Sequence, residues 1–327
     1  AGTTVGGCRR LGEQRVMTMA KYRLITRRDL DGLVCAMLLK ELDLVEDIVF
    51  VHPKDVQDGK VEVTANDITA NVPYVPGAHL AFDHHYSEML RNVGTEDPHY
   101  INIPNAPSAA RVIYDYYGGR ERFPKMGQDL MASVDRADAA KFTKPQVLNE
   151  SGWDLLSFIL DPRTGLERFA NFAIPHDDFV VQLIDYCRGH TIDEIMALPA
   201  VEERVELYRA QRQQAEHQIK TCATVHNKVV VIDFRDQDTI YCANRFLVYA
   251  MFPTCNLSIH ALRGPNPDTI VFAIGKSIFN RSSRIDIDQL TLSYGGGGHE
   301  AVGTCQVPTD QAERVLGELI ERIRRTG

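Results

Sequence analysis

Long apolar segments are missing from this sequence. A membrane-spanning helix needs about 20 continuous apolar residues, whereas the best apolar runs, Leu33–Leu39 and Phe179–Leu183, are short and flanked by charged side chains. These runs therefore indicate buried elements of a globular protein, and we expect no membrane association. A secretory signal is not indicated either, because Arg9 and Arg10 precede no apolar block with a cleavage pattern.

An excess of positive charge is also missing. The 36 Lys and Arg residues are outnumbered by 44 Asp and Glu residues, which gives a net charge of −8 with neutral histidine. Bulk electrostatic attraction to nucleic acid is therefore excluded as the basis of binding, although a local basic groove remains compatible with this balance.

Cysteine is sparse, and no two cysteines form a CxxC pair. The seven cysteines are scattered along the chain. An odd, scattered set is typical of reduced thiols in a cytoplasmic protein, where they act as small buried hydrophobes. We therefore expect a cytoplasmic location.

The overall composition is that of an ordinary globular protein, with 44% hydrophobic and 24% charged residues. At about 150 residues per domain, the chain length suggests two domains. Residues 1–18, which begin with a segment rich in Gly and Thr, are expected to be a flexible leader or a cloning remnant. The alternative is a short native arm packed on the body.

Strand-like and helix-like segments alternate within residues 19–198. We expect strands at 22–26, 48–51, 61–64 and 78–82, and helices at 33–42, 108–117 and 130–140. Ser108 is a suitable N-cap for the second of these helices. The alternation predicts an α/β domain with a mostly parallel sheet flanked by helices. In such a sheet, the ligand crevice lies beyond the carboxyl ends of the strands.

The remainder of the chain divides into a connector and a second domain. Residues 199–226 are polar with a thin apolar stripe, which predicts one long connector helix. A smaller α/β domain is predicted for residues 227–327 from strands at 229–234, 257–262 and 269–274, a helix near 243–250 and a final amphipathic helix from Thr309.

Acidic and imidazole side chains gather where the strands of the first domain are expected to end. Each one alone fits a helix cap or a turn. Together, carboxylates and imidazoles without a thiolate fit Mn²⁺ or Mg²⁺, with Zn²⁺ as an alternative, and two such ions suit an in-line phosphoryl displacement. The side chains in question are Asp29, Asp31, Asp67, Asp83, His84, His85, Asp135 and Asp138.

These segments resemble the motifs of the DHH phosphoesterases. The signature triplet is Asp83-His84-His85, and the resemblance extends from about residue 20 to residue 327 in the expected order. The branch it resembles is described as exopolyphosphatase-like or oligoribonuclease-like. The other matching segments are 28–32 (RDLDG), 66–67 (ND), 107–110 (PSAA), 133–138 (SVDRAD) and 295–299 (GGGGH).

The resemblance implies a role for each matching residue. It implies one or two divalent ions, Mn²⁺ or else Mg²⁺ or another metal, with Asp31 also contributing to catalysis. His85 would donate a proton or stabilise charge at the scissile phosphate. The implied metal ligands are Asp29, Asp31, Asp67, His84 and Asp135.

The same resemblance implies that the second domain binds a substrate phosphate. Backbone amides beside a helix start, and arginine side chains, are suitable anion donors. The alternatives are a flexible turn for the glycines and a solvated hairpin tip for the arginines. The implied substrate-binding residues are Gly296, Gly297, Gly298, His299, Arg281 and Arg284.

One departure from the family pattern concerns the first motif. Many members carry a histidine two or four residues before the first Asp, where this chain has Arg27 and Ile25. Isoleucine cannot bind a metal and a guanidinium repels one. One metal site is therefore expected to be weakened or absent, or to borrow Asp138.

The sequence thus predicts a metal-dependent phosphohydrolase in which activated water attacks phosphorus. Suitable substrates are short oligonucleotides, dinucleotides or polyphosphate, because the acidic balance disfavours a long nucleic-acid track. A homodimer is compatible with the pattern. The alternative is a catalytically impaired member that binds nucleotides or regulates, since the first-motif histidine is absent.

Overall fold

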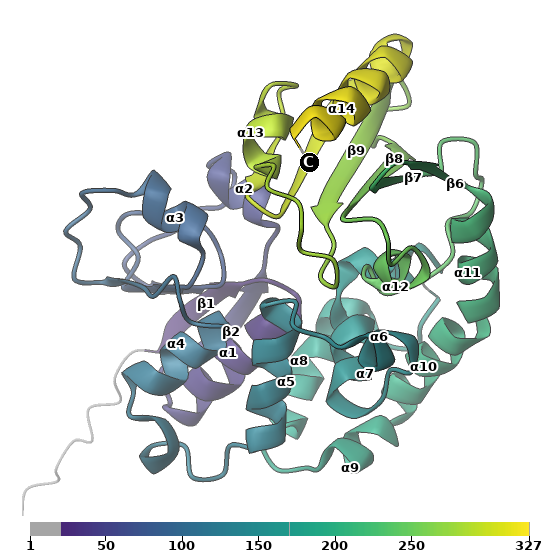
Figure 1. The fold of residues 1–327 in the computed structure, drawn as a ribbon. Helices are drawn as coiled ribbons and strands as arrows, with labels where there is room; N and C mark the ends of the chain where they lie inside the picture. The colour runs from purple at the N-terminus through teal and green to yellow at the C-terminus, as the bar shows by residue number, and fades with distance from the viewer. Residues whose placement is uncertain (1–20, 170, 327) are drawn as a thin grey trace, which may run out of the picture.

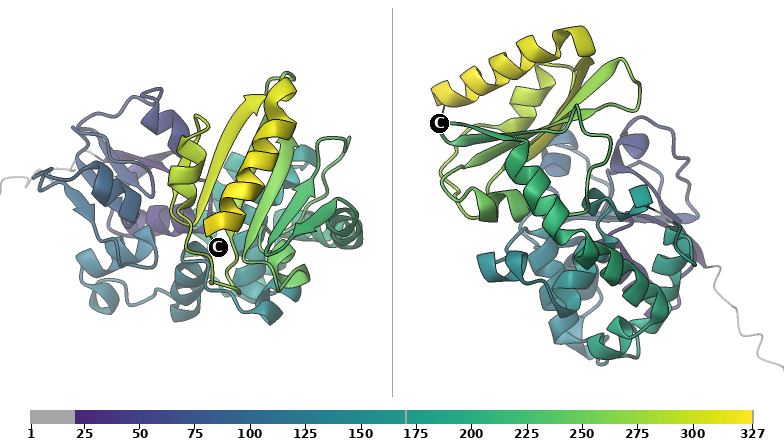
Figure 2. Two further views of the ribbon diagram at one scale, coloured as in Figure 1. Left: turned by 45° about the horizontal axis from the view of Figure 1, so that its top comes forward. Right: turned by 90° about the vertical axis from the view of Figure 1, so that its right-hand side faces the viewer.

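The structure is a computed structural model that describes residues 21–169 and 171–326, so the expected leader at 1–18 lies outside the described residues. The chain forms two bodies, each built around its own β-sheet, with the chain between them running along one side (Figures 1 and 2). The predicted α/β class, with a parallel sheet flanked by helices and a second, smaller sheet domain, is confirmed.

The first sheet has five strands in the order β2-β1-β3-β4-β5, all parallel to their neighbours. The chain moves outward from β1 to β2 and then crosses back over β1 to β3. A crevice is expected at such a switch, outside the carboxyl ends of β1 and β3. The strands are β1 (Tyr22–Thr26), β2 (Val45–Phe50), β3 (Asp67–Ala70), β4 (Leu80–Asp83) and β5 (Tyr100–Asn102).

One predicted strand is wrong. Residues 61–64 form a loop, and the strand begins only at Asp67. Of the loop residues, only Glu62 is exposed and the other three are half-buried, whereas all four residues of β3 are buried, so burial selects the later segment as the central strand.

Helix α1 (Leu30–Glu41) is the central helix of the first body, and residues 30–39 are all buried. Such an all-round apolar helix must be covered on every side, and α4, α5, α7 and α8 pack against it. The predicted cap of α4 is confirmed, because Ser108 Oγ accepts from the backbone N–H of Arg111 at 3.0 Å. The further helices are α2 (Pro53–Gln57), α3 (Tyr86–Arg91), α4 (Ala109–Tyr116), α5 (Gln128–Asp138), α6 (Lys144–Leu148), α7 (Gly152–Leu160), α8 (His176–Tyr186) and α9 (Ile192–Met196).

The connector differs from the single helix predicted for 199–226. It consists of α10 (Pro199–Ala210) and α11 (Arg212–Thr221), which meet at Gln211, and its last residues form strand β6 (Ala223–His226). Gln211 is buried and accepts a hydrogen bond from the backbone N–H of Cys242 at 2.9 Å. The β-branched residues of β6 favour the strand that pairs with β7.

The second sheet has six strands in the order β10-β11-β9-β8-β7-β6, and only β7 and β8 are parallel to each other. Helix α14 lies along one face of this sheet (Figure 2) and buries Val315, Leu319 and Ile323 there. None of the described helices is long and apolar enough to cross a membrane. The elements are β7 (Val229–Asp233), β8 (Leu257–Arg263), β9 (Thr269–Lys276), β10 (Gly297–His299), β11 (Val302–Pro308), α12 (Leu247–Met251), α13 (Ile287–Leu292) and α14 (Ala312–Thr326).

A shared apolar cluster joins the two bodies. Phe142 and Phe158 from the first body pack with Phe246 from the second, and the Phe142 and Phe246 ring centroids are 5.6 Å apart. The carboxylate of Glu150 accepts from Tyr208 Oη at 2.6 Å and also from Asn244 Nδ2. Both bodies therefore contribute to one packed interface.

The turn from β1 into α1 depends on a glycine. A Cβ atom on Gly32 would lie 1.9 Å from the carbonyl oxygen of Arg27 and 2.9 Å from Thr26 Oγ1. Only glycine allows the start of α1 to approach the end of β1 this closely.

We expect Gly32→Ala to lower the free energy of unfolding by about 1–3 kcal/mol, because the backbone at Arg27 must move. Chemical denaturation measures this change. The control is Gly317→Ala in α14, where nothing lies within 4 Å of the added Cβ and stability should be equal or higher by about 0.5–1 kcal/mol. Equal midpoints for Gly32→Ala and the unmodified protein would contradict this account.

Candidate active site

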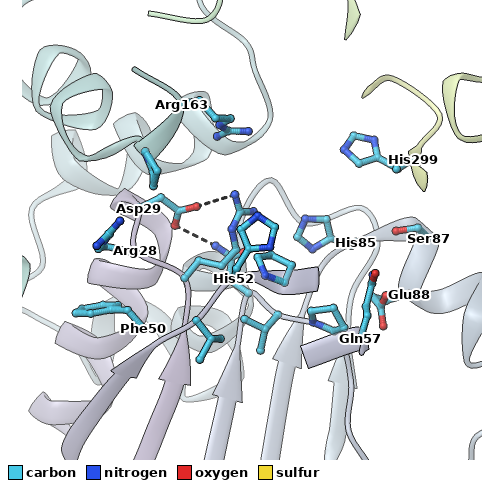
Figure 3. Close-up of a pocket in the computed structure, with 18 of the residues that line it drawn as sticks. Arg28, Asp29, Phe50, His52, Gln57, His85, Ser87, Glu88, Arg163 and His299 are labelled. Carbon is cyan, nitrogen blue, oxygen red and sulfur yellow. Dashed lines mark hydrogen bonds and ion pairs between the residues drawn. The ribbon is translucent and has the colours of Figure 1, made fainter. Parts of the chain in front are cut away.

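The carboxyl ends of the first sheet's strands border a cavity of about 500 Å³ (Figure 3). Residues after β1, β2, β3 and β4 form its floor, and Gly298 and His299 from the second body border it on the other side. Its lining includes Arg27, Arg28, Asp29, Phe50, His52, Gln57, Asn71, His85, Ser87, Glu88, Arg91, Arg163, Gly298 and His299.

Asp31, His84 and Asp138 form a cluster beside this cavity. One ligand atom from each lies within 4.8 Å of the others, the one such group of three among the described residues. His84 Nδ1 lies 3.0 Å from the carbonyl oxygen of Ala106, so it donates there and leaves Nε2 facing Asp138 Oδ2 at 2.6 Å. Asp31 accepts from the backbone N–H groups of Ala109 at 3.0 Å and Ala110, at the start of α4.

The protonation of this cluster follows from burial and crowding. Burial and the charge of Asp138 raise the pKa of Asp31 to about 7. Burial alone would lower the pKa of His84, but the hydrogen bond and charge of Asp138 raise it to about 10. Burial would raise the pKa of Asp138, but His84 holds it below its usual range. A buried group of this kind holds protons or a cation in their place.

Asp29 has a structural partner for each oxygen. It is the N-cap of α1, accepting from Gly32 N at 3.0 Å, and Oδ1 also accepts from Asn71 Nδ2 at 3.2 Å. Arg27 Nη2 lies 3.2 Å from Oδ2. Dashed lines in Figure 3 mark interactions of Asp29 with its neighbours. The capping explanation, which the sequence left open for Asp29, therefore holds.

His85 is oriented by its neighbour in the triplet. Its Nδ1 donates to Asp83 Oδ1 at 2.7 Å, which directs the opposite edge of the ring to the cavity. Burial would lower the pKa of His85, but the charge of Asp83 raises it above the ordinary value. A protonated imidazole at this position is suited to donate a proton to a leaving oxygen.

The second body contributes Gly298 and His299 to the cavity, as Figure 3 shows for His299. The glycines do not lie beside a helix start as predicted, because residues 297–299 form strand β10 and Gly298 N donates to Asp288 Oδ1 at 2.9 Å. A Cβ on Gly296 would lie 2.1 Å from the carbonyl oxygen of Thr304. The glycine run thus allows close strand packing.

Two predicted substrate-binding arginines, Arg281 and Arg284, lie away from the cavity. Arg281 and Arg284 are exposed and line neither the large cavity nor the small one described below. Arg281 instead reaches the carbonyl oxygens of Ile278 and Ala140, at 3.2 and 3.4 Å. It therefore belongs to the contact between the two bodies.

The structure does not bring Asp67 and Asp135 to the cluster. Asp67 begins β3, at the opposite edge of the sheet, and accepts from Arg23 Nε at 2.6 Å. Asp135 accepts from Ser108 Oγ at 2.8 Å and forms an ion pair with Arg111. The residue at the carboxyl end of β3 is Asn71, and the residue of α5 that meets His84 is Asp138.

Sequence reasoning missed two arginines near the cluster. Arg163 and Arg245 line a small cavity of about 30 Å³ together with Asp31, Asp138 and Asp161. Burial would raise the pKa of Asp161, but these two arginines lower it to about 2. Neither arginine lies in a motif, and Arg245 comes from the second body, so no local pattern marks them.

Comparison with solved structures gives a strong likeness. The pGpG-specific phosphodiesterase PggH from Vibrio cholerae is 50% identical over 94% of this chain and 100% of its own, with a TM-score of 0.80. The RecJ structure in complex with Mn²⁺ from Thermus thermophilus is 11% identical over 94% of this chain and 53% of its own, with a TM-score of 0.51, which shows a shared fold. No family profile and no curated sequence matches.

Asp67 provides a test of the corrected assignment. Burial would raise its pKa, but hydrogen bonds from Arg23 and Thr64 hold it below the ordinary value of 3.8. The folded-state pKa is thus below the unfolded one, so its stabilisation is present above about pH 4 and lost as the pH falls further.

We expect Asp67→Asn to lower the free energy of unfolding by about 1.5–3 kcal/mol at pH 7. The deficit relative to the unmodified protein should shrink between pH 4 and pH 3. Urea denaturation across this range measures it, and Mn²⁺ binding should be unchanged. Loss of Mn²⁺ binding with unaltered stability would show that Asp67 is a metal ligand, as the family resemblance implied.

Proposed function

The chain belongs to the DHH phosphoesterase family, and from this we propose that it hydrolyses short linear dinucleotides such as pGpG with a divalent ion at Asp31, His84 and Asp138. The predicted phosphoesterase activity itself is confirmed by the 50% identity with a phosphodiesterase along the whole of that protein. The alternative of an impaired, purely binding member is left without support.

The observation that carries the substrate proposal is the cavity that residues of both bodies border. Its volume, about 500 Å³, is in the range of small-molecule sites, about 300–1,000 Å³. Cationic or hydrogen-bonding groups line it from both sides, with His85 below and Arg163 and His299 above (Figure 3). A short anionic ligand suits this space better than a long polymer. PggH is specific for pGpG, and we extend that substrate to this chain.

The donor set supports the metal proposal. Two carboxylates and an imidazole are suitable ligands for Mn²⁺ or Mg²⁺. The hydrogen bond of His84 Nδ1 to Ala106 fixes which ring nitrogen is free, as partners of metal-binding histidines usually do. When bound there, a divalent ion supplies Lewis-acid activation of water and neutralisation of phosphate charge.

The chain's own groups would position the phosphate and move protons. His85, held by Asp83, would donate a proton to the leaving oxygen. His299 and Arg163 on the opposite side of the cavity would orient the nucleotide by hydrogen bonds to its phosphates.

The six described cysteines are free, which is compatible with a cytoplasmic location. A homodimer remains part of the proposal to be tested by light scattering.

A substrate panel tests the function. We expect turnover of pGpG in Mn²⁺, slower turnover of a five-nucleotide RNA, and little turnover of cyclic dinucleotides or polyphosphate, because the volume of about 500 Å³ suits a short linear ligand. Product formation by chromatography measures each rate.

His85→Ala should lower kcat on pGpG by about 10²–10⁴-fold, because the leaving oxygen loses its proton donor. A preference for polyphosphate over pGpG would overturn the substrate proposal.

The metal site is tested by a matched pair on helix α5. We expect Asp138→Asn to abolish high-affinity Mn²⁺ binding and activity, because it removes a carboxylate that meets His84 at 2.6 Å. Asp135→Asn, three residues earlier, should keep both, because Asp135 is paired with Arg111 instead. Calorimetric Mn²⁺ titration distinguishes them. If the two variants bound Mn²⁺ equally well, the ligand assignment would be wrong.

A further inference from the structure

A second concentration of charge lies next to the proposed metal cluster, around Asp29. All three groups that meet this carboxylate are donors: Gly32 N at 3.0 Å, Asn71 Nδ2 at 3.2 Å and Arg27 Nη2 at 3.2 Å. Asp31 also accepts two hydrogen bonds, but both come from neutral backbone amides. Asp29 instead faces a guanidinium, and a carboxylate paired with a fixed cation does not fit the role of ligand to a second cation.

Asn71 shows why the charge here differs from that at the first cluster. It lies just after β3, at the same edge of the sheet as Asp29, and is fully buried. Its amide donates to Asp29, and its Oδ1 has no hydrogen-bond partner. A neutral amide contributes no negative charge, so one carboxylate at most faces a cation at this position.

Arg27 supplies the positive charge instead. Its side chain is only 21% exposed. Its Nη2 lies 3.2 Å from Asp29 Oδ2, and a guanidinium is not deprotonated in proteins, so it stays charged. A permanent cation in the middle of these carboxylates would repel a divalent ion brought beside it. The residues around Asp29 therefore do not fit a second metal.

The formal charges lead to the same conclusion. Metal binding requires ionised carboxylates and a neutral His84. In that state Asp29, Asp31, Asp138 and Asp161 carry four negative charges, and Arg27, Arg163 and Arg245 carry three positive ones. One divalent ion would change the resulting −1 to +1, which matches the single negative charge of a phosphodiester. Two ions would leave +3 in a largely buried site, and uncompensated buried charge is costly.

We propose that this protein holds a single divalent ion and that the guanidinium of Arg27 acts as the second, fixed cation toward the scissile phosphate. Arg27 lines the same cavity as His85 and His299. Its fork of N–H donors can remain paired with Asp29 while another edge meets a phosphate oxygen. Only the kinetic part of this proposal rests on the proposed function.

The number of bound ions is measured without substrate. Purified protein loaded with Mn²⁺ and desalted should contain one equivalent by elemental analysis, and its electron paramagnetic resonance spectrum should be that of an isolated Mn²⁺ ion. Asp138→Asn should retain none. Two equivalents, or the spectrum of an exchange-coupled pair, would overturn the proposal, whatever substrate the enzyme prefers.

The role of Arg27 is measured by a matched pair at the two ends of β1. Arg27→Ala should keep one Mn²⁺ and lose about 10²–10³-fold in kcat, as expected for removal of a transition-state donor. Arg23→Ala removes a similar arginine–aspartate pair at the opposite edge of the sheet, so it should keep kcat. Arg27→Lys, which keeps the charge without the fork, should fall between them and is used if Arg27→Ala does not fold.

The result that contradicts the proposal is an Arg27→Ala kcat equal to that of Arg23→Ala. A complete absence of dinucleotide turnover in the unmodified protein would instead count against the proposed function, while the Mn²⁺ count would still decide the number of ions. The two failures are therefore distinguishable.

Discussion

The structure depends on offsetting the repulsion between the carboxylates that are buried at the carboxyl ends of the strands of the first sheet. Asp29, Asp31, Asp138 and Asp161 lie around one small cavity. Their charges are offset by groups from several parts of the chain: the amides at the start of α4, the imidazole of His84, and the guanidinium groups of Arg27, Arg163 and Arg245. Helix α4, the turn at residues 161–165 and the second body therefore each supply groups that offset these negative charges.

The parts of the fold and site that could be predicted are those with a strong local signal. The Asp29 cap, the buried run of α1 and the Ser108 cap are each set by neighbours within a few residues, and the structure has them, although α1 begins at Leu30 and not at Leu33. The triplet that begins at the last residue of β4 could be placed for the same reason, because a short buried apolar run ends where the polar residues begin.

The parts that could not be predicted depend on partners distant in the sequence. Pairing with β1 and β4 places Asp67 at the start of β3 and Asn71 just after its end. The sequence alone does not say which of the two residues lies at the carboxyl end of this strand. Asp135 and Asp138 are three residues apart and share a helix face, so spacing alone does not say which one meets His84. Gln211 divides the connector because of a contact with Cys242, about 30 residues further along the chain.

The aromatic cluster between the two bodies has a consequence for what the enzyme can accept. Phe142, Phe158 and Phe246 pack in one core beside the small cavity, so the separation of His85 from His299 is set by close-packed rings and not by a loose hinge. For the proposed dinucleotide substrate, this fixed separation would limit the length of the nucleotide chain that fits between the two histidines. A change of ring size at this interface would alter the separation and with it the chain length that fits.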